Sequence, residues 1–504
     1  MTTAPDTTPE ELDAVMERAA AAAPLLAALT PDERAGLLRA VADALDGAAD
    51  ELVPIAMEEA HYPEARCRGE LGRTTFQLRL FAETLEEGSY LEAAVDPADP
   101  DWGTPRPDVR RLLVPLGPVV VFGASNFPFA FATAGGDSAS ALAAGCPVVV
   151  KAHPGHLRLA RRTAEIVVAA LDGAGAPEGG FALVEGVETG KRAVTHPLTR
   201  AVGFTGSIPG GRALFDLAVS RPDPIPFYGE LGSVNPVFVT RAAAAARGDE
   251  ILGGYADSAT MGSGQFCTKP GVLFVPEETK LDALVADFGG RAAAPLLNER
   301  VSEGFVRGLD ALSAHPATEV LVQGVRTGDD WAPSLLRTDL DSLLENAETL
   351  LEECFGPATL VVTYPDERRL LEAAGVFGGQ LTVTVHGEED DEIAPALLAL
   401  GASLAGRVLW NSWPTGVAVT HAMTHGGPYP ATTAPLHTSV GTTAIRRFLR
   451  PVTYQSVPQS LLPRELRDDN PLGVPRRVNG AAPSAGPTRR ARRPTRPASA
   501  VPGG

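Results

Sequence analysis

Residues 119–151 read VVVFGASNFPFAFATAGGDSASALAAGCPVVVK, and this stretch decides the fold of the chain. Two apolar runs, Val119–Phe122 and Val148–Lys151, flank a small-residue segment near 132–144 that is predicted to be helical. Continuous apolar strands that alternate with helices are typical of a parallel sheet covered on both faces. The stretch therefore predicts an α/β protein.

The same alternation continues along the chain. It predicts helices near 156–172 and 210–219, strands at Phe181–Val184, Ala201–Phe204 and Val237–Val239, and a second α/β stretch over about 250–420. Upstream, segments 8–60 and 69–86 have helical periodicity, with Thr30 as an N-cap. Short strands are expected at 109–114, and the alternating segment 436–457 is expected to form an edge or exchanged strand pair.

The composition limits the classes of partner and the cell compartment. The net charge of −19 disfavours nucleic acid and anionic membrane surfaces as main partners. The N-terminus lacks a signal-peptide pattern, and the longest apolar runs are too short to span a bilayer. The 4 scattered cysteines, without a CxxC pair, indicate neither a disulfide framework nor a zinc site. We therefore expect a cytoplasmic protein.

A second stretch carries the candidate chemistry. Residues 261–271, MGSGQFCTKPG, place Cys267 on a glycine-rich approach, and Glu230 lies upstream in the segment FYGELGSVNP. A thiol and a carboxylate suit covalent acyl chemistry, in which the thiolate attacks a carbonyl and the carboxylate later activates water. The alternatives are a buried core cysteine and a salt-bridge glutamate. The flanking glycines favour a tight loop that exposes Cys267.

The ends of the predicted strands supply further candidate residues. Lys151 ends one strand, and Gly206, Ser207 and Gly211 follow another. Strand ends that open onto helix N-termini are anion sites, so together they favour a nucleotide, although each alone also fits a tight turn. No GxGxxG fingerprint follows the first strand. Asn126, just after that strand, either aims an amide N–H at an oxyanion or simply forms a turn.

Histidines raise the question of a metal or a catalytic dyad. His153 and His156 lie three residues apart, and His421 and His425 lie four apart, but no acidic ligand pattern accompanies either pair. We therefore expect no metal site. A cysteine-protease dyad is an alternative, but it leaves Glu230 and the nucleotide-like strand ends unexplained.

In this order the motifs resemble the aldehyde dehydrogenase superfamily over about residues 10–480. The set is SNFP with Asn126, VVK with Lys151, FTGS with Ser207, ELG with Glu230, GQFC with Cys267, and ECFGP at 353–357. Within the superfamily, the runs at 69–75, 122–129, 134–145, 426–433 and 438–452 resemble α-ketoglutaric semialdehyde (2,5-dioxovalerate) dehydrogenases. The resemblance implies two Rossmann-like parallel-sheet domains and a small oligomerisation strand region.

The resemblance also implies a role for each motif residue. Cys267 is the expected nucleophile, Asn126 and the Cys267 backbone N–H form the oxyanion hole, and Glu230 activates the deacylating water. An aldehyde becomes a carboxylate through a thiohemiacetal and a thioester, and Glu230 favours hydrolysis over acyl transfer to coenzyme A. The expected residues around the cofactor, NADP or NAD, are Lys151, Gly206, Ser207, Gly211, Glu353 and Phe355.

Cofactor preference rests on the position three residues after Lys151. NAD-preferring relatives commonly have a glutamate there, which binds the ribose diol, whereas this chain has Pro154. Losing that carboxylate removes repulsion of a 2′-phosphate, and Lys151 and Arg158 add attraction. NADP, or use of both cofactors, is therefore expected.

Substrate preference is expected to depend on a cation in the substrate tunnel. Arg73 lies on the helix that lines this tunnel in the superfamily, so it is the candidate partner of a distal carboxylate, with a surface arginine as the alternative. Phe127 is an expected tunnel wall. The expected substrate is 2,5-dioxopentanoate, with 2-oxoglutarate as product. Many relatives are expected to have a polar run containing arginine at residues 434–437, where this chain reads APLH. If this loop touches the substrate, the difference changes which aldehyde is preferred.

The expected organisation follows the same resemblance. The segments are 1–107, the helical N-terminal part of the cofactor domain; 108–117, the first oligomerisation strands; 118–231, the NAD(P)-binding domain; 232–420, the catalytic domain; 421–460, the return segment and further oligomerisation strands; 461–480, a C-terminal segment; and 481–504, a disordered Arg/Pro-rich tail. A homodimer or homotetramer is expected. Competing hypotheses are a dehydrogenase of fatty or aromatic aldehydes and a non-catalytic scaffold with this fold.

Overall fold

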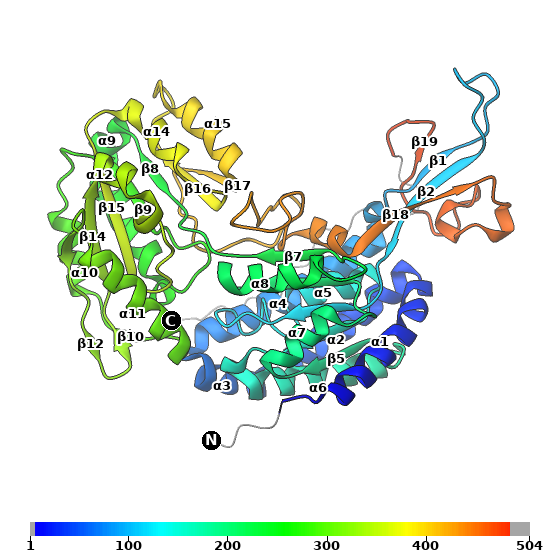
Figure 1. Cartoon of the computed structure of the whole chain (residues 1–504). Coiled ribbons are helices and arrows are strands. Elements are labelled where there is room, and N and C mark those ends of the chain that lie inside the picture. Colours follow the sequence, from blue (N-terminus) through cyan, green and yellow to red (C-terminus); the bar gives the residue numbers. More distant parts are fainter. Residues whose placement is uncertain (1–5, 484–504) are drawn as a thin grey trace, which may run out of the picture.

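Two α/β halves and a projecting arm make up residues 6–483, which the computed structural model describes (Figure 1). The N-terminal half is built on a five-stranded sheet, the C-terminal half on a seven-stranded sheet, and the arm on a four-stranded sheet. The two large sheets confirm the predicted α/β class. The tail expected at 481–504 lies, beyond residue 483, outside the described residues.

Four helices open the N-terminal half: α1 (Pro9–Ala28), α2 (Pro31–Gly47), α3 (Ala49–Ala60) and α4 (Glu64–Glu87). Thr30 caps α2 in a capping box with Glu33, which confirms the predicted N-cap. Helix α4 ends where Gly88 adopts a left-handed conformation, with φ of 86°. Helices α2 and α4 pack side by side, so the segment that carries Arg73 is fixed against the body.

The five-stranded sheet of the N-terminal half is entirely parallel, in the order β5-β4-β3-β6-β7. Its strands are β3 (Val119–Phe122), β4 (Val148–Lys151), β5 (Phe181–Val184), β6 (Ala201–Thr205) and β7 (Phe227–Glu230). The intervening helices are α5 (Gly136–Ala144), α6 (Leu157–Gly173), α7 (Val187–Thr195) and α8 (Ile208–Val219). The strand order reverses between β3 and β6, and ligands of such sheets bind at the carboxyl ends beside this reversal.

Most predicted elements of this half are confirmed, with one late start. Helix α5 begins at Gly136 rather than near residue 132. The chain turns sharply before it: Gly135 is extended, and a Cβ there would lie 2.5 Å from the carbonyl oxygen of Ala130. The small residues before Gly136 therefore serve a tight turn, not a helix.

The seven-stranded sheet of the C-terminal half has the order β11-β14-β15-β9-β8-β16-β17. Only β11 is antiparallel to its neighbour. The strands are β8 (Val237–Val239), β9 (Val272–Pro276), β11 (Glu319–Val322), β14 (Ser334–Asp339), β15 (Ala358–Tyr364), β16 (Gln380–His386) and β17 (Ala405–Trp410). The helices are α9 (Arg241–Thr260), α10 (Asp282–Gly290), α11 (Glu299–Ala314), α12 (Leu340–Glu345), α13 (Ala347–Leu350), α14 (Leu370–Gly375) and α15 (Ala394–Leu404).

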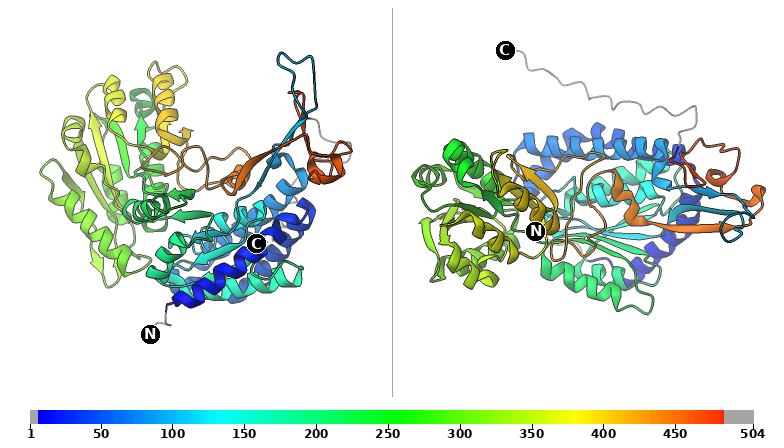
Figure 2. Two further views of the ribbon diagram at one scale, coloured as in Figure 1. Left: turned by 45° about the vertical axis from the view of Figure 1, so that its right-hand side comes forward. Right: turned by 90° about the horizontal axis from the view of Figure 1, so that it is seen from above.

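The arm joins segments from both ends of the chain in the order β18-β2-β1-β19. Its strands are β1 (Ala94–Asp96), β2 (Val109–Pro115), β18 (Leu449–Gln455) and β19 (Arg477–Val478). Both views of Figure 2 show it extending away from the two halves. Strand structure is confined to the last part of the segment expected at 436–457, because residues 442–448 form a 3-10 helix before β18.

The chain crosses between the halves twice, and the two crossings are hydrogen-bonded to each other. Leu231 N donates to the carbonyl oxygen of Ala431 at 2.8 Å, and Thr433 N donates to that of Gly229 at 3.0 Å. Glu230 therefore sits on an antiparallel bridge with Thr432. None of the helices between residues 6 and 483 combines the length and the apolar character that a bilayer crossing requires.

Candidate active site

Cys267 lies on the loop that follows α9 and precedes β9. This loop passes through three successive left-handed residues, Gly262, Ser263 and Gly264, with φ of 56°, 56° and 64°. A Cβ at Gly264 would lie 2.2 Å from the carbonyl oxygen of Gly356, so only glycine fits this close approach. The turn leaves Cys267 half-buried, as the glycine-rich sequence predicted.

The side chains of Asn235, His425 and Glu230 contact Cys267. Asn235 Nδ2 donates hydrogen bonds to the carbonyl oxygens of Cys267 and Lys269 at 2.8 and 2.9 Å, which fixes the loop. Cys267 Sγ lies 3.5 Å from His425 Nε2. Burial, followed by the charge of Glu230, raises the pKa of the thiol well above its usual value. Ionisation of Cys267 therefore needs a proton acceptor or a positive charge close by.

Glu230, the last residue of β7, is buried, and both of its carboxylate oxygens accept hydrogen bonds. His425 Nε2 lies 2.7 Å from Oε1, and Ser439 Oγ donates to Oε2 at 2.6 Å. Burial opposes ionisation, but the charge of His425 and these hydrogen bonds outweigh it, so the pKa of Glu230 lies below its usual value. A carboxylate is thus held ready beside the thiol.

Asn126 reaches the same place from the end of β3. Its side chain is buried, and Nδ2 donates to the carbonyl oxygen of Gln265 at 3.1 Å, two residues before Cys267. The adjacent Phe127 ring packs edge-on against Phe131 and Phe266, with ring centroids 5.3 and 5.2 Å away. The structure therefore brings Asn126, Glu230 and Cys267 together from three separate segments.

Arg73, on α4, points into the protein toward this cluster. Its guanidinium carbon lies 5.2 Å from the centroid of the Phe131 ring, and Nη2 donates to the carbonyl oxygen of Val417 at 3.3 Å. Burial lowers the pKa of Arg73, while the charges of Glu70, Cys267 and Glu230 act in the opposite sense. Its Nη1 is buried and has no hydrogen-bond partner within residues 6–483. Arg73 is not a surface arginine.

The cofactor edge, defined as Lys151, Gly206, Ser207 and Gly211, lies at the carboxyl ends of β4 and β6. Ser207 caps α8 by accepting a hydrogen bond from Gly210 N at 3.4 Å. Lys151 is buried and forms no ion pair inside the described range 6–483. An unpaired cation beside a helix N-terminus suits the phosphates of a nucleotide. Gly211 packs tightly: a Cβ there would lie 2.1 Å from the Leu231 side chain.

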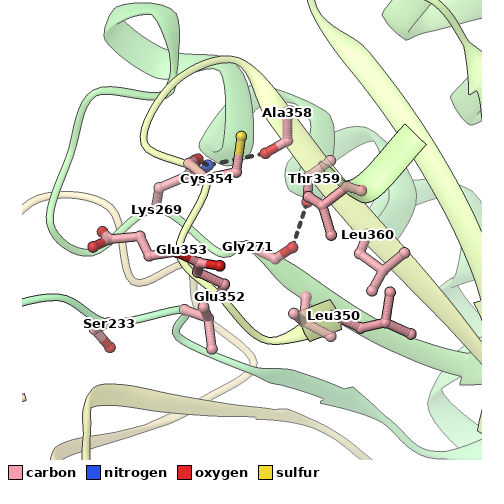
Figure 3. A pocket seen from close by; sticks show the side chains of 13 residues that line it. Ser233, Lys269, Gly271, Leu350, Glu352, Glu353, Cys354, Ala358, Thr359 and Leu360 are labelled. Carbon is pink, nitrogen blue, oxygen red and sulfur yellow. Dashed lines mark hydrogen bonds between the residues drawn. The ribbon is translucent and has the colours of Figure 1, made fainter. Parts of the chain in front are cut away.

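Glu353 and Phe355 lie on the loop before β15, beside a pocket lined by Ser233, Lys269 and Glu353 (Figure 3). Lys269 holds this loop, because Nζ donates to the carbonyl oxygens of Cys354, Gly356 and Ala358 at 2.5, 2.9 and 2.9 Å. Burial raises the pKa of Glu353 to about 7, and the charge of Lys269 opposes that shift.

Comparisons with known proteins agree with this geometry. The family model described as "Aldehyde dehydrogenase family" matches residues 1–304. The chain is 44% identical over 459 residues to an α-ketoglutaric semialdehyde dehydrogenase of Acinetobacter baylyi, covering 90% of this chain and 87% of the relative. The chain belongs to the aldehyde dehydrogenase family. The protein is therefore an oxidoreductase that acts on aldehydes, and enzymes of this family use NAD(P).

Two further relatives of this aldehyde dehydrogenase extend the comparison. α-Ketoglutaric semialdehyde dehydrogenase 2 of Azospirillum brasilense is 44% identical over 458 residues, covering 89% of this chain and 87% of the relative. The solved structure of a glyceraldehyde-3-phosphate dehydrogenase from Methanocaldococcus jannaschii, complexed with NADP, superposes with a TM-score of 0.77 at 19% identity. That superposition covers 90% of this chain and 95% of the other, and it establishes a shared fold.

Residues that the sequence did not assign complete the site of this aldehyde dehydrogenase. His425 contacts both Cys267 and Glu230, although the sequence flagged it only in a histidine pair. Lys269 was noted as a cation after the nucleophile, but its contacts show that it anchors a loop. Ser439, inside the run 438–452, was given no role by the sequence. Its contact with Glu230 arises only from the tertiary fold.

The histidine pairs divide into structural and site residues. His156 lies 2.8 Å from the carbonyl oxygen of Ala124, and His153 accepts from Gly155 N at 3.0 Å, so both stabilise the turn after β4. The ligand atoms of Glu230, Cys267 and His425 lie within 4.8 Å of one another, a spacing that a metal ion would fit. We assign this group to proton transfer, because 2.7 Å between His425 and Glu230 is a hydrogen-bond distance.

The dyad of a cysteine protease does not account for His425. In such dyads one ring nitrogen faces the nucleophile and the other is oriented by a third group. Here Nε2 faces both Cys267 and Glu230, and Nδ1 is buried with no hydrogen-bond partner in the described part of the chain. The remaining cysteines, Cys67, Cys146 and Cys354, are buried free thiols.

Proposed function

We propose that this aldehyde dehydrogenase oxidises 2,5-dioxopentanoate to 2-oxoglutarate, with NADP as the preferred cofactor. The observation that carries the proposal is the convergence of Cys267, Glu230 and Asn126 beside Arg73, a cation turned toward the reacting group. The two curated relatives at 44% identity bear the name of this semialdehyde dehydrogenase, which supports the same substrate.

The first half of the reaction forms a thioester on Cys267. The Cys267 thiol loses its proton to solvent, while His425 Nε2, 3.5 Å from Sγ, donates to Glu230 Oε1 at 2.7 Å and holds the carboxylate beside the thiolate. The thiolate adds to the aldehyde carbon, and Asn126 Nδ2 with the Cys267 backbone N–H stabilises the oxyanion of the thiohemiacetal. NAD(P)⁺ supplies the hydride acceptor when bound.

The second half releases the acid. Glu230, whose depressed pKa keeps it ionised, takes a proton from water, and the hydroxide attacks the thioester carbonyl. Asn126 again stabilises the oxyanion, and the Cys267 thiolate leaves. Overall, aldehyde, water and NADP⁺ give carboxylate, NADPH and two protons. Retention of Glu230 favours this hydrolysis over transfer to coenzyme A.

The cofactor preference rests on charge at the adenosine end. Pro154 stands where a ribose-binding glutamate would repel a 2′-phosphate, and the charge of Arg300 acts on Lys151 from the start of α11. Arg158 is an exposed side chain already paired with Glu58 at 2.5 Å, so it contributes less than the sequence suggested. Lys151 and Arg300 are the cations that remain for the phosphate.

The test is NADPH or NADH formation at 340 nm with purified protein, 2,5-dioxopentanoate, hexanal and benzaldehyde. We expect kcat/KM for the dioxo acid to exceed that of hexanal at least about 100-fold, and Arg73→Ala to remove most of this preference. Equal turnover of hexanal or benzaldehyde would replace the substrate with a fatty or aromatic aldehyde. No turnover of any aldehyde would favour the scaffold hypothesis.

We also propose that the arm mediates assembly into a homodimer or homotetramer. Strand β18 is the edge of the four-stranded sheet, and an unpaired strand edge is a template for another strand. The domain boundaries given above remain part of this proposal, with the arm also drawing β1 from the segment 1–107 and β19 from the segment 461–480. Light scattering of the protein before and after a Val452→Pro substitution, which alters this edge, tests the interface; an unchanged mass would exclude it.

A further inference from the structure

Two arginines from opposite halves of the molecule hold one short loop. Arg73 on α4 donates to the carbonyl oxygen of Val417 at 3.3 Å. Arg407 on β17 donates to the carbonyl oxygens of Gly416, at 2.9 Å, and Pro414. Both guanidinium groups therefore lie against the loop 414–417, which joins β17 to the second crossing between the halves.

Arg407 occupies the face of its sheet that is turned toward the nucleophile. It pairs with Thr382 on the neighbouring strand β16, and paired residues project from the same face. Thr382 Oγ1 donates to Asn235 Oδ1 at 3.0 Å, and Asn235 Nδ2 donates to the carbonyl oxygen of Cys267 at 2.8 Å. Thr382 and Asn235 thus connect Arg407 to the Cys267 loop. The charge of Cys267 accordingly acts on the pKa of Arg407, which burial lowers.

Each arginine keeps one buried donor unused. Arg73 Nη1 and Arg407 Nε have no hydrogen-bond partner among residues 6–483, and neither side chain forms a salt bridge there. Glu70, the carboxylate that acts most on Arg73, instead accepts hydrogen bonds from Phe129 N and Ala130 N at 2.8 and 3.0 Å. Buried cations without a counter-ion are costly unless an anion binds between them.

We infer that Arg407 is the second half of a two-arginine site that binds the carboxylate end of the substrate while the aldehyde meets Cys267. This inference rests on the proposed function. Some N–H groups of each guanidinium hold the loop 414–417, and Arg73 Nη1 and Arg407 Nε remain for the anion. The site is formed before the substrate arrives, and it selects aldehydes with a distal carboxylate over uncharged ones.

Arg247 shows what an arginine with only a structural role looks like here. It lies near the far end of β17, where Nη2 donates to the carbonyl oxygen of Gly387 and to Asn411 Oδ1 at 3.2 and 3.1 Å. Unlike Arg407, it also pairs with a carboxylate, Glu388, at 3.0 Å. Arg247 is therefore a matched control for the loss of backbone contacts without the loss of an anion site.

The experiment compares Arg407→Met, Arg407→Lys and Arg247→Gln with the unchanged chain, using 2,5-dioxopentanoate and hexanal. We expect Arg407→Met to raise KM for the dioxo acid about 10- to 100-fold, with a much smaller effect on hexanal. Arg407→Lys restores part of the loss, because it keeps the charge, and Arg247→Gln leaves the ratio of the two substrates unchanged.

An equal loss for both aldehydes in Arg407→Met, without rescue by lysine, would make Arg407 a loop anchor only and overturn the inference. So would an unchanged KM for the dioxo acid. Calorimetric binding of 2-oxoglutarate to Arg407→Met and the unchanged chain gives a second readout: weakened binding supports the site, and equal binding excludes it. Failure of the unchanged chain to oxidise the dioxo acid would instead refute the proposed function.

Discussion

The catalytic cluster and the cofactor edge both use carboxyl ends of strands in the five-stranded sheet, yet they are built differently. The catalytic cluster, defined as Asn126, Glu230, Cys267 and His425, comes from four distant segments, and its side chains bond to one another or to the nucleophile loop. The cofactor edge comes from two short turns, and Ser207 bonds only to its own helix. One site depends on the tertiary fold, the other on local turn geometry.

Because of this difference, the catalytic cluster is suited to carry out the chemical steps and the cofactor edge to bind the cofactor. Side chains that hold each other can shift pKa values and position protons, as Glu230 and Cys267 show. Backbone turns and a helix terminus instead present a fixed set of N–H groups that any phosphate can use. Substitutions in the cluster should therefore act on the rate of individual chemical steps, and substitutions at the edge on affinity.

The largest expected effect is the loss of the nucleophile. Cys267→Ala should lower kcat by more than about 10⁴-fold, since no other group can form the thioester. NADP binding, followed by fluorescence titration, should change little because the cofactor edge is separate. The buried Cys67→Ala is the control and should keep its activity. Residual turnover above 1% of the original would show that Cys267 is not the required nucleophile.

The second-largest expected effect is the loss of the base Glu230. Glu230→Gln keeps the shape of the side chain and one of its two acceptor oxygens but cannot accept a proton from water, so steady-state turnover should fall about 10²- to 10⁴-fold. Acylation should survive, giving a rapid burst of NADPH close to one per active site. A rapid-quench experiment with mass spectrometry should find the acyl-enzyme. Absence of both the burst and the adduct would place Glu230 in the first half-reaction instead.

Glu353, on the loop before β15, should make the stability of the protein depend on pH. The pKa of Glu353 is raised to about 7, so its protonated form favours folding. That contribution is fully present below the unfolded value of about 4.5 and is lost as pH rises through 7. Between pH 4.5 and 7, Glu353→Gln should gain stability relative to the unchanged chain, on the order of 3 kcal/mol by denaturant unfolding. The exposed neighbour in Glu352→Gln should show no such trend, and parallel curves for both variants would refute the shift.

The smallest effect should come from the cofactor edge. Ser207→Ala removes the N-cap of α8 and should cost about 1 kcal/mol of unfolding free energy. KM for NADP should rise a few-fold with kcat nearly unchanged. Ser220→Ala, at the other end of α8, is the control and should stay within about 0.5 kcal/mol. A fall in kcat comparable to that of Glu230→Gln would make the edge part of the chemistry.

The sequence predicted structure best where interactions between residues close in the chain determine it. The apolar strands β3, β4 and β5 match their predicted bounds because they are buried on the sheet. The glycines flanking Cys267 predicted a tight loop, and the structure forms it with three left-handed residues. By contrast, His425 lies 158 residues from Cys267 in sequence, and only the fold brings them together. Arg407 gave no signal for the same reason. Alternation at 436–457 suggested strands, but residues 442–448 coil into a 3-10 helix.

The paired crossings between the halves have a mechanical consequence. Hydrogen bonds tie residues 229–231 to 431–433, so the two connections behave as one hinge. Points on the axis of a rotation move least, and Glu230 belongs to one connection while His425 lies just before the other. A rotation of one half against the other would therefore leave Glu230 and His425 in register, while Arg73 and Arg407, which contact the loop 414–417 from opposite halves, would be drawn apart.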